Sequence, residues 1–107
     1  DPSLYEAAML DGAKKMQQLL QDLRDHRPAE IAGRKVEHFV DYLTQTQWDL
    51  PRSNVLQYDL EGGSQVIVRP SGTEPQIKIY LTAAKTPEEN AAELSALETA
   101  MRALLSE

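Results

Sequence analysis

The sequence contains no cysteine. A chain without cysteine forms no disulfide bond, no thiolate zinc site and no cysteine nucleophile, so a reducing compartment is its simplest setting. Long hydrophobic runs are missing too, because no stretch approaches the roughly 18 apolar residues that a membrane-spanning helix needs. The amino end shows no signal-peptide pattern. We therefore expect a cytoplasmic protein with no membrane partner.

Positive charge is scarce. The chain has 11 Lys and Arg residues against 17 Asp and Glu residues, which gives a net charge of -6. A net negative charge opposes non-specific attraction to phosphate backbones, so we do not expect a nucleic acid partner. The glycine-rich and Walker patterns of nucleotide-binding loops are absent as well, which argues against a nucleotide site of those two kinds.

The remaining composition is typical of a globular domain. Of 107 residues, 41% are hydrophobic and 26% are charged. This length suits one domain, since a compact unit usually takes roughly 100 to 200 residues. We therefore expect residues 1–107 to form a single domain. Because the chain begins at Asp1 without an initiator methionine, we expect it to be a fragment of a longer protein.

Two amphipathic helices are predicted from apolar residues at helical spacing. Pro28 ends the first, and a capping box at residues 86–89 begins the second. Residues 1–12 allow two interpretations, an early helical turn or an irregular lead-in. The apolar positions of the two helices are Met16, Leu19, Leu20 and Leu23, then Leu94, Leu97, Met101, Leu104 and Leu105.

Alternating apolar residues predict strands between the two helices. Their ranges are 31–43, 55–60, 65–69 and 76–81. The alternation in the first is imperfect, so we expect a β-bulge there. Residues 44–53 form a polar segment that predicts a loop, with Trp48 packing back on an apolar surface.

The hydrophobic pattern also selects the length of the first hairpin loop. A three-residue loop at residues 61–63 sets Tyr58 opposite Val66 and Leu56 opposite Val68, which keeps one face of the hairpin apolar. Short connections between successive strands favour an antiparallel sheet. The predicted fold class is therefore α+β, with a sheet of about four strands and two helices packed on one face.

Residues 69–75, with the sequence Arg-Pro-Ser-Gly-Thr-Glu-Pro, hold more polar chemistry than a turn requires. Gly72 lets a ligand approach the backbone N–H closely, and Ser71 and Thr73 add hydroxyl donors. Arg69 adds a planar fork that matches phosphate or carboxylate oxygens. The prolines at both ends of the segment restrict φ and lower the entropy lost on binding. This pattern predicts an anion site.

Strand pairing adds a second cation to this site. If Arg69 lies opposite Gln76, then Lys78 lies opposite Ile67, on the same face as Arg69 and one diagonal step away. That spacing is roughly 7 to 8 Å between backbones. Both cations can then reach one dianion. A plain hairpin connection, with Arg69 paired to Glu74 on the surface, is the alternative, and the physical pattern alone does not decide between them.

These residues also carry a family resemblance. Residues 69–75, followed by Ile-Lys-Ile-Tyr at 77–80, resemble the phosphate-binding loop in the C-terminal domain of the phosphohexomutases, the phosphoglucomutase and phosphomannomutase superfamily. The likeness runs from about residue 11 to the final helix. It implies a TATA-binding-protein-like fold and a four-domain enzyme that transfers phosphoryl intramolecularly between C1 and C6 of a hexose phosphate.

The resemblance assigns roles residue by residue. Arg69, Ser71, Gly72 and Thr73 fall on the positions that bind the substrate phosphate, and Lys78 falls where many members have arginine. It implies that the catalytic serine loop and the Mg2+ loop belong to preceding domains, which would be partners of this one. The chain alone is then inactive, and its ligand is a glucose or mannose phosphate. A stand-alone phosphate- or phosphopeptide-binding module, or a structural dimerisation domain, is the competing hypothesis.

Other polar residues have structural interpretations. His26 and His38 are far apart in sequence and lack acidic neighbours at metal-ligand spacing, so neither is expected to bind a metal ion. Arg34 and Lys35 form a lone basic pair after Gly33, for which we expect solvent exposure.

Overall fold

The computed structural model describes residues 3–10, 13–43, 54–70 and 76–105 of the chain. The predicted loop at residues 44–53, including Trp48, lies outside them. Two α-helices, one three-residue 3₁₀ turn at Glu61–Gly63 and six strands occur in the described residues. Their bounds are β1 Ser3–Leu10, α1 Ala13–Asp25, β2 Glu30–Ile31, β3 Arg34–Asp41, β4 Leu56–Leu60, β5 Gln65–Pro70, β6 Gln76–Ala83 and α2 Pro87–Leu105.

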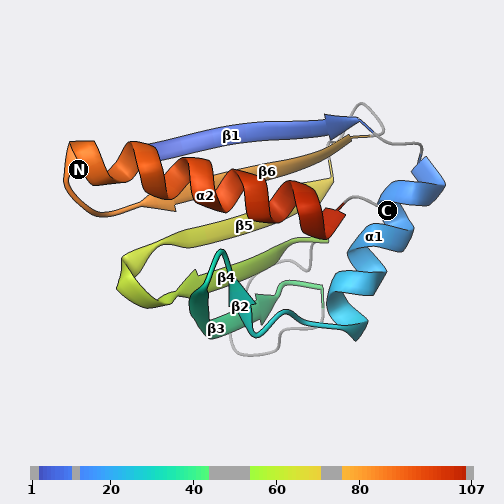
Figure 1. Cartoon of the computed structure of the whole chain (residues 1–107). Coiled ribbons are helices and arrows are strands. Elements are labelled where there is room, and N and C mark those ends of the chain that lie inside the picture. Colours follow the sequence, from blue (N-terminus) through green and yellow to red (C-terminus); the bar gives the residue numbers. More distant parts are fainter. Residues whose placement is uncertain (1–2, 11–12, 44–53, 71–75, 106–107) are drawn as a thin grey trace.

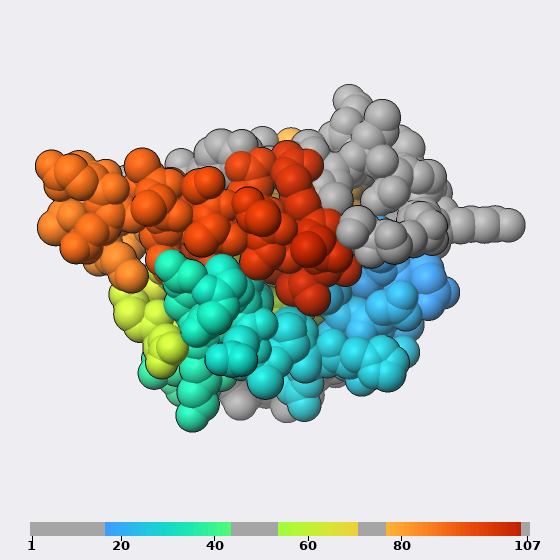
Figure 2. Space-filling view, in the orientation of Figure 1, coloured from blue at the N-terminus to red at the C-terminus, as the bar shows by residue number. Residues whose placement is uncertain are grey.

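The strands form one antiparallel sheet in the order β1-β6-β5-β4-β3-β2 (Figure 1). Side chains from α1, α2 and the alternate positions of the central strands belong to one hydrophobic core, so both helices cover the same face. Figure 2 shows this face, with α2 lying along the segment of β2 and β3. The α+β prediction is confirmed, with six strands in the described residues instead of about four.

The core consists of buried apolar residues that alternate along the strands and recur at helical spacing. α1 ends at Asp25, before Pro28, and the Thr86 hydroxyl accepts a hydrogen bond from the Glu89 N–H (3.3 Å) at the start of α2. Of the predicted apolar positions in α2, Leu104 is exposed. The buried core residues of the helices and central strands are Leu19, Leu20, Leu23, Leu56, Tyr58, Leu60, Val66, Val68, Ile77, Ile79, Leu81, Leu97, Met101 and Leu105.

Both interpretations of residues 1–12 were wrong for the part that the structure describes. Residues 3–10 form β1, which pairs with β6 from Ser3 opposite Ala83 to Leu10 opposite Gln76. β5 occupies the other side of β6. Pairing with β1 therefore satisfies backbone groups of β6 that would otherwise lie at an open sheet edge, and this tertiary requirement overrides weak local preference.

The predicted strand at residues 31–43 is divided in two. Ala32 (φ 54°) and Gly33 (φ 78°) turn the chain between β2 and β3, which pair with each other. Glycine adopts this positive φ without steric cost. The expected bulge is confirmed, because the register of β3 against β4 shifts between Val36 and His38.

The register of the β4–β5 hairpin is as predicted. Tyr58 lies opposite Val66 and Leu56 opposite Val68, with Glu61–Gly63 as the three-residue loop. Gly62 and Gly63 both have positive φ, 85° and 92°. The Leu60 N–H closes the loop by donating to the Ser64 carbonyl (2.9 Å).

Tyr58 lies at the centre of the core and packs on Phe39 with 5.1 Å between ring centroids. Its buried hydroxyl has no hydrogen-bond partner among the described residues, and burial raises the pKa of Tyr58 above its usual value. We expect Tyr58→Phe to leave the free energy of unfolding unchanged or raise it by up to about 1 kcal/mol, because it removes an unsatisfied polar group. Urea unfolding tests this. A loss of more than about 1 kcal/mol would show that the hydroxyl is hydrogen-bonded.

No helix in the described part of the chain is both long and apolar enough to cross a lipid bilayer.

Candidate functional site

The structure places Arg69 on β5 directly opposite Lys78 on β6. Facing residues of an antiparallel pair point to the same side of the sheet. Because the sequence neighbours Val68, Ile77 and Ile79 are buried in the core, both cations lie on the face that the helices leave uncovered. Two of the predicted site residues are therefore brought together. Ser71, Gly72 and Thr73 lie outside the described residues, so their contribution stays a prediction.

The predicted β5–β6 register was wrong by two residues. Val68 lies opposite Ile79 instead of Ile77, and Val66 lies opposite Leu81. A shift of two residues keeps every side chain on its face, so the hydrophobic alternation could not distinguish the two registers. The observed register buries Leu81 against Val66 in the core.

In the observed register the two cations are closer to each other than the sequence suggested. Directly opposite side chains have Cβ atoms roughly 4.5 to 5.5 Å apart, less than the diagonal spacing that the sequence suggested. Two like charges at such positions repel each other unless an anion or an acidic side chain compensates them. Arg69 is exposed and Lys78 is partly buried.

Sequence reasoning missed Tyr80. The Arg69 guanidinium carbon lies 5.6 Å from the centroid of the Tyr80 ring. In the observed register Tyr80 is opposite Ile67, one diagonal step from Arg69. The correct register would have revealed this contact, because diagonal neighbours on one face are within reach of long and aromatic side chains.

A second polar centre links α2 to the sheet. The buried Glu93 carboxylate accepts hydrogen bonds from the Arg34 guanidinium (2.5 and 3.0 Å) and the Ser64 hydroxyl (2.6 Å), and the Lys85 ammonium lies 3.5 Å away. The predicted exposure of Arg34 was wrong: 30% of its side chain is exposed, against 2% for Glu93. Lys35 is exposed, as expected.

The pKa of Glu93 reflects opposing effects. Burial raises the pKa of this carboxyl, but hydrogen bonds from Ser64 and Arg34 and the charges of Arg34 and Lys85 outweigh burial and lower it overall. Glu93 is therefore ionised at neutral pH and is held in place by donors on three sides. Its polar contacts among the described residues, to Arg34, Ser64 and Lys85, are internal to the domain, so we assign Glu93 to stability instead of ligand binding.

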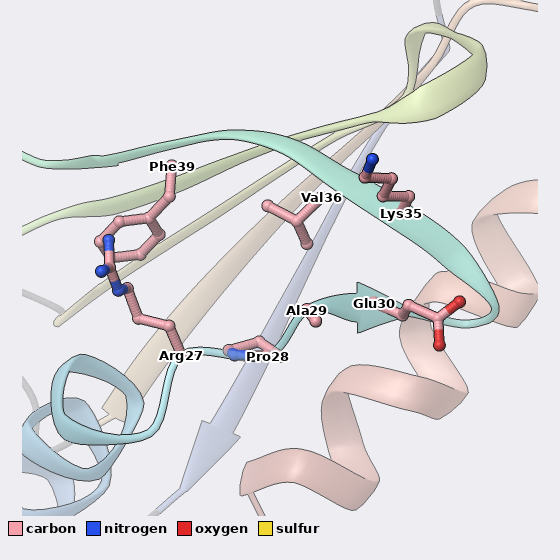
Figure 3. A pocket seen from close by; sticks show the side chains of 7 residues that line it. All are labelled: Arg27, Pro28, Ala29, Glu30, Lys35, Val36 and Phe39. Carbon is pink, nitrogen blue, oxygen red and sulfur yellow. The ribbon is translucent and has the colours of Figure 1, made fainter.

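A shallow hollow of about 520 Å³ lies between the end of α1 and β3 (Figure 3). Its floor is apolar, and the Arg27 guanidinium carbon lies 5.0 Å from the centroid of the Phe39 ring. None of the predicted site residues lines it. The residues that do are Arg27, Pro28, Ala29, Glu30, Lys35, Val36 and Phe39.

Metal ligands do not gather in the described residues: no three His, Asp or Glu side chains there lie close enough together to hold a metal ion. On β3, His38 lies opposite Asp59 of β4, but no third ligand joins them in this part of the chain.

Comparison with known proteins identifies the family of this sequence. A family model described as the phosphoglucomutase/phosphomannomutase C-terminal domain matches residues 11–100. A probable phosphomannomutase of Haemophilus influenzae is 41% identical over 88 residues, which cover 81% of this chain and 17% of that protein. A phosphoglucomutase of Staphylococcus aureus is 39% identical over 83 residues, covering 68% of this chain and 15% of that protein.

The chain thus spans about a sixth of the length of these curated relatives. The family match includes all of α1, the strands β2 to β6 and most of α2, and it contains both Arg69 and Lys78. The chain therefore belongs to the family of phosphoglucomutase/phosphomannomutase C-terminal domains.

Proposed function

We propose that this chain is the substrate-phosphate-binding domain of a longer phosphoglucomutase or phosphomannomutase. The observation that carries the proposal is the direct pairing of Arg69 with Lys78 where the β5–β6 hairpin leads into residues 71–75. A guanidinium fork beside an ammonium group suits a dianionic phosphate. Ser71, Gly72 and Thr73 are proposed to complete the site with hydroxyl and backbone N–H donors.

The domain would bind and orient the substrate without reacting with it. We expect it to grip the phosphate that is not transferred while the hexose lies against other domains of the longer chain. Such a clamp contributes orientation and water exclusion to catalysis. We expect Mg2+ and the phosphoryl-accepting serine to be supplied by those other domains, and residues 1–107 alone to have no mutase activity. A cytoplasmic location is part of the same proposal.

The experiment is a mutase assay of the full-length protein with glucose 1-phosphate and mannose 1-phosphate, compared with Lys78 variants. Lys78→Ala should lower kcat/KM about tenfold, since a contact between a charged group and phosphate contributes roughly 1.5 kcal/mol. Lys78→Arg should retain activity, because the charge remains and arginine can bind phosphate through two N–H groups.

Lys35→Ala is the matched control, since Lys35 is an exposed lysine on β3, away from the β5–β6 hairpin. It removes the same charge from the same domain and should leave kcat/KM unchanged. If Lys35→Ala and Lys78→Ala lower kcat/KM equally, the effect comes from the net charge of the domain and not from a contact between Lys78 and phosphate. Phosphate binding by a full-length protein without mutase activity would favour the stand-alone binding module instead.

A further inference from the structure

The described arginines are held in two different ways. Three form ion pairs with carboxylates, and two lie over aromatic rings. The ion pairs are Arg24 with Asp41 (2.9 Å), Arg34 with Glu93 (2.5 Å) and Arg102 with Glu98 (2.9 Å). The ring contacts are Arg27 over Phe39 (5.0 Å) and Arg69 over Tyr80 (5.6 Å). Arg69 forms no ion pair with any described residue.

This difference matters for an arginine that has to bind an anion. A carboxylate holds the guanidinium by occupying its N–H donors and cancelling its charge. An aromatic ring holds the flat face by cation–π attraction and leaves the in-plane N–H donors and the positive charge available. Tyr80 therefore restrains Arg69 without competing for the ligand that Arg69 would bind.

The restraint comes from the sheet and not from a loop. Tyr80 lies in the middle of β6, paired with Ile67 on one side and with Glu6 of β1 on the other. Strands on both sides fix the backbone that carries the ring, and Tyr80 itself is partly buried. A free arginine side chain loses rotamer entropy when it is immobilised. Holding Arg69 in place before the ligand arrives reduces this loss on binding.

We propose that Tyr80 is a positioning residue that holds the Arg69 guanidinium over its ring and so orients the N–H donors toward the substrate phosphate. This inference rests on the proposed role of Arg69 in phosphate binding. It assigns Tyr80 no contact with the phosphate. The aromatic face is what matters, and the phenol hydroxyl is not required.

The test is a double-mutant cycle in the full-length protein, with KM for the hexose 1-phosphate that it turns over and the inhibition constant of inorganic phosphate as readouts. Tyr80→Thr keeps a residue that favours strands but removes the ring. It should raise both constants about two- to fivefold, the range of an exposed cation–π contact. Tyr80→Phe retains the ring and should match the wild type.

The cycle is completed in the Arg69→Ala background. There Tyr80→Thr should have no further effect, because the group that it positions is gone. Phe39→Leu removes the other arginine contact over a ring and should leave both constants unchanged. If Tyr80→Thr lowers the melting temperature, Tyr80→Leu replaces it, and the same effect on both constants is expected.

Three results would overturn the positioning role. The first is that Tyr80→Thr leaves KM and the inhibition constant unchanged, and the second is that Tyr80→Phe raises them as much as Tyr80→Thr does. The third is that Tyr80→Thr still raises them in the Arg69→Ala background. Each is distinguishable from failure of the proposed function. If Arg69→Ala alone leaves both constants unchanged, phosphate binding by Arg69 itself is wrong. If Arg69→Ala weakens binding while Tyr80→Thr does not, the proposed function stands and only the role of Tyr80 falls.

Discussion

Replacing Glu93 with alanine is expected to lower the free energy of unfolding of the domain by about 3 kcal/mol, because breaking a buried ion pair leaves its partner charge uncompensated. Arg34 would lose its carboxylate, and the buried Ser64 hydroxyl would lose its acceptor. Since the free energy of unfolding of a domain is usually only about 5 to 15 kcal/mol, the expected loss is a large fraction of the total stability. Urea or thermal unfolding measures the change.

Glu98→Ala is the matched control, because Glu98 is in the same helix and pairs with Arg102 four residues later on the surface. Surface pairs of this kind contribute about 0.3 to 0.5 kcal/mol. We therefore expect a much smaller loss in Glu98→Ala than in Glu93→Ala. Similar losses in the two variants would mean that the Glu93 cluster adds no more than a surface ion pair.

The Glu93 cluster also predicts how stability depends on pH. The pKa of the Glu93 carboxyl is lowered in the folded state from an ordinary value of 4.5. A group with a lowered folded pKa contributes stability that is fully present above the unfolded pKa and is lost as pH falls through the folded pKa. The stability difference between the wild type and Glu93→Gln should therefore be largest at neutral pH and narrow below pH 4.5. A difference that widens on acidification would contradict the assigned shift.

Arg69→Ala should lower kcat/KM of the full-length protein about 10- to 150-fold, which corresponds to roughly 1.5 to 3 kcal/mol for a charge-assisted contact. The fold should be unaffected, because Arg69 is exposed and forms no ion pair in the described part of the chain. Steady-state kinetics with hexose 1-phosphate and a thermal melt of the same sample measure both quantities.

Arg102→Ala provides the control, since Arg102 is an exposed arginine on α2, 48% of whose side chain is accessible. It should leave kcat/KM unchanged. Arg69→Lys should recover part of the activity, because lysine restores the charge but not the bidentate geometry. If Arg69→Ala retains full activity, Arg69 is not part of the phosphate site.

Much of the fold followed from local patterns. The hydrophobic alternation predicted the β4–β5 register and the three-residue loop, because any shift by one residue would have turned Tyr58 or Val66 away from the core. The capping box and the helical spacing of apolar residues predicted α2, because each of these patterns depends only on residues that are close together in the sequence.

The errors share a physical origin. β1 is a strand because β6 is there to pair with it, and nothing in residues 1–12 alone shows that partner. The predicted β5–β6 register was wrong by two residues, because hydrophobic alternation repeats every two residues and fits both registers. Arg34 looked like a surface residue because its partner Glu93 lies 59 positions away in the sequence. In each case a long-range contact decided the outcome.

For the candidate site too, the sequence and the tertiary structure each supplied a different part of the answer. The sequence by itself supplied the candidates for anion binding, since Arg69, Ser71, Gly72, Thr73 and Lys78 carry cationic, hydroxyl or backbone N–H donors, and their role in binding stays a prediction. Only the tertiary structure decided that Arg69 and Lys78 are direct neighbours and that Tyr80 lies under the guanidinium. The physical reason is that side-chain chemistry belongs to each residue alone, whereas the distance between two side chains depends on the pairing of strands that the core selects.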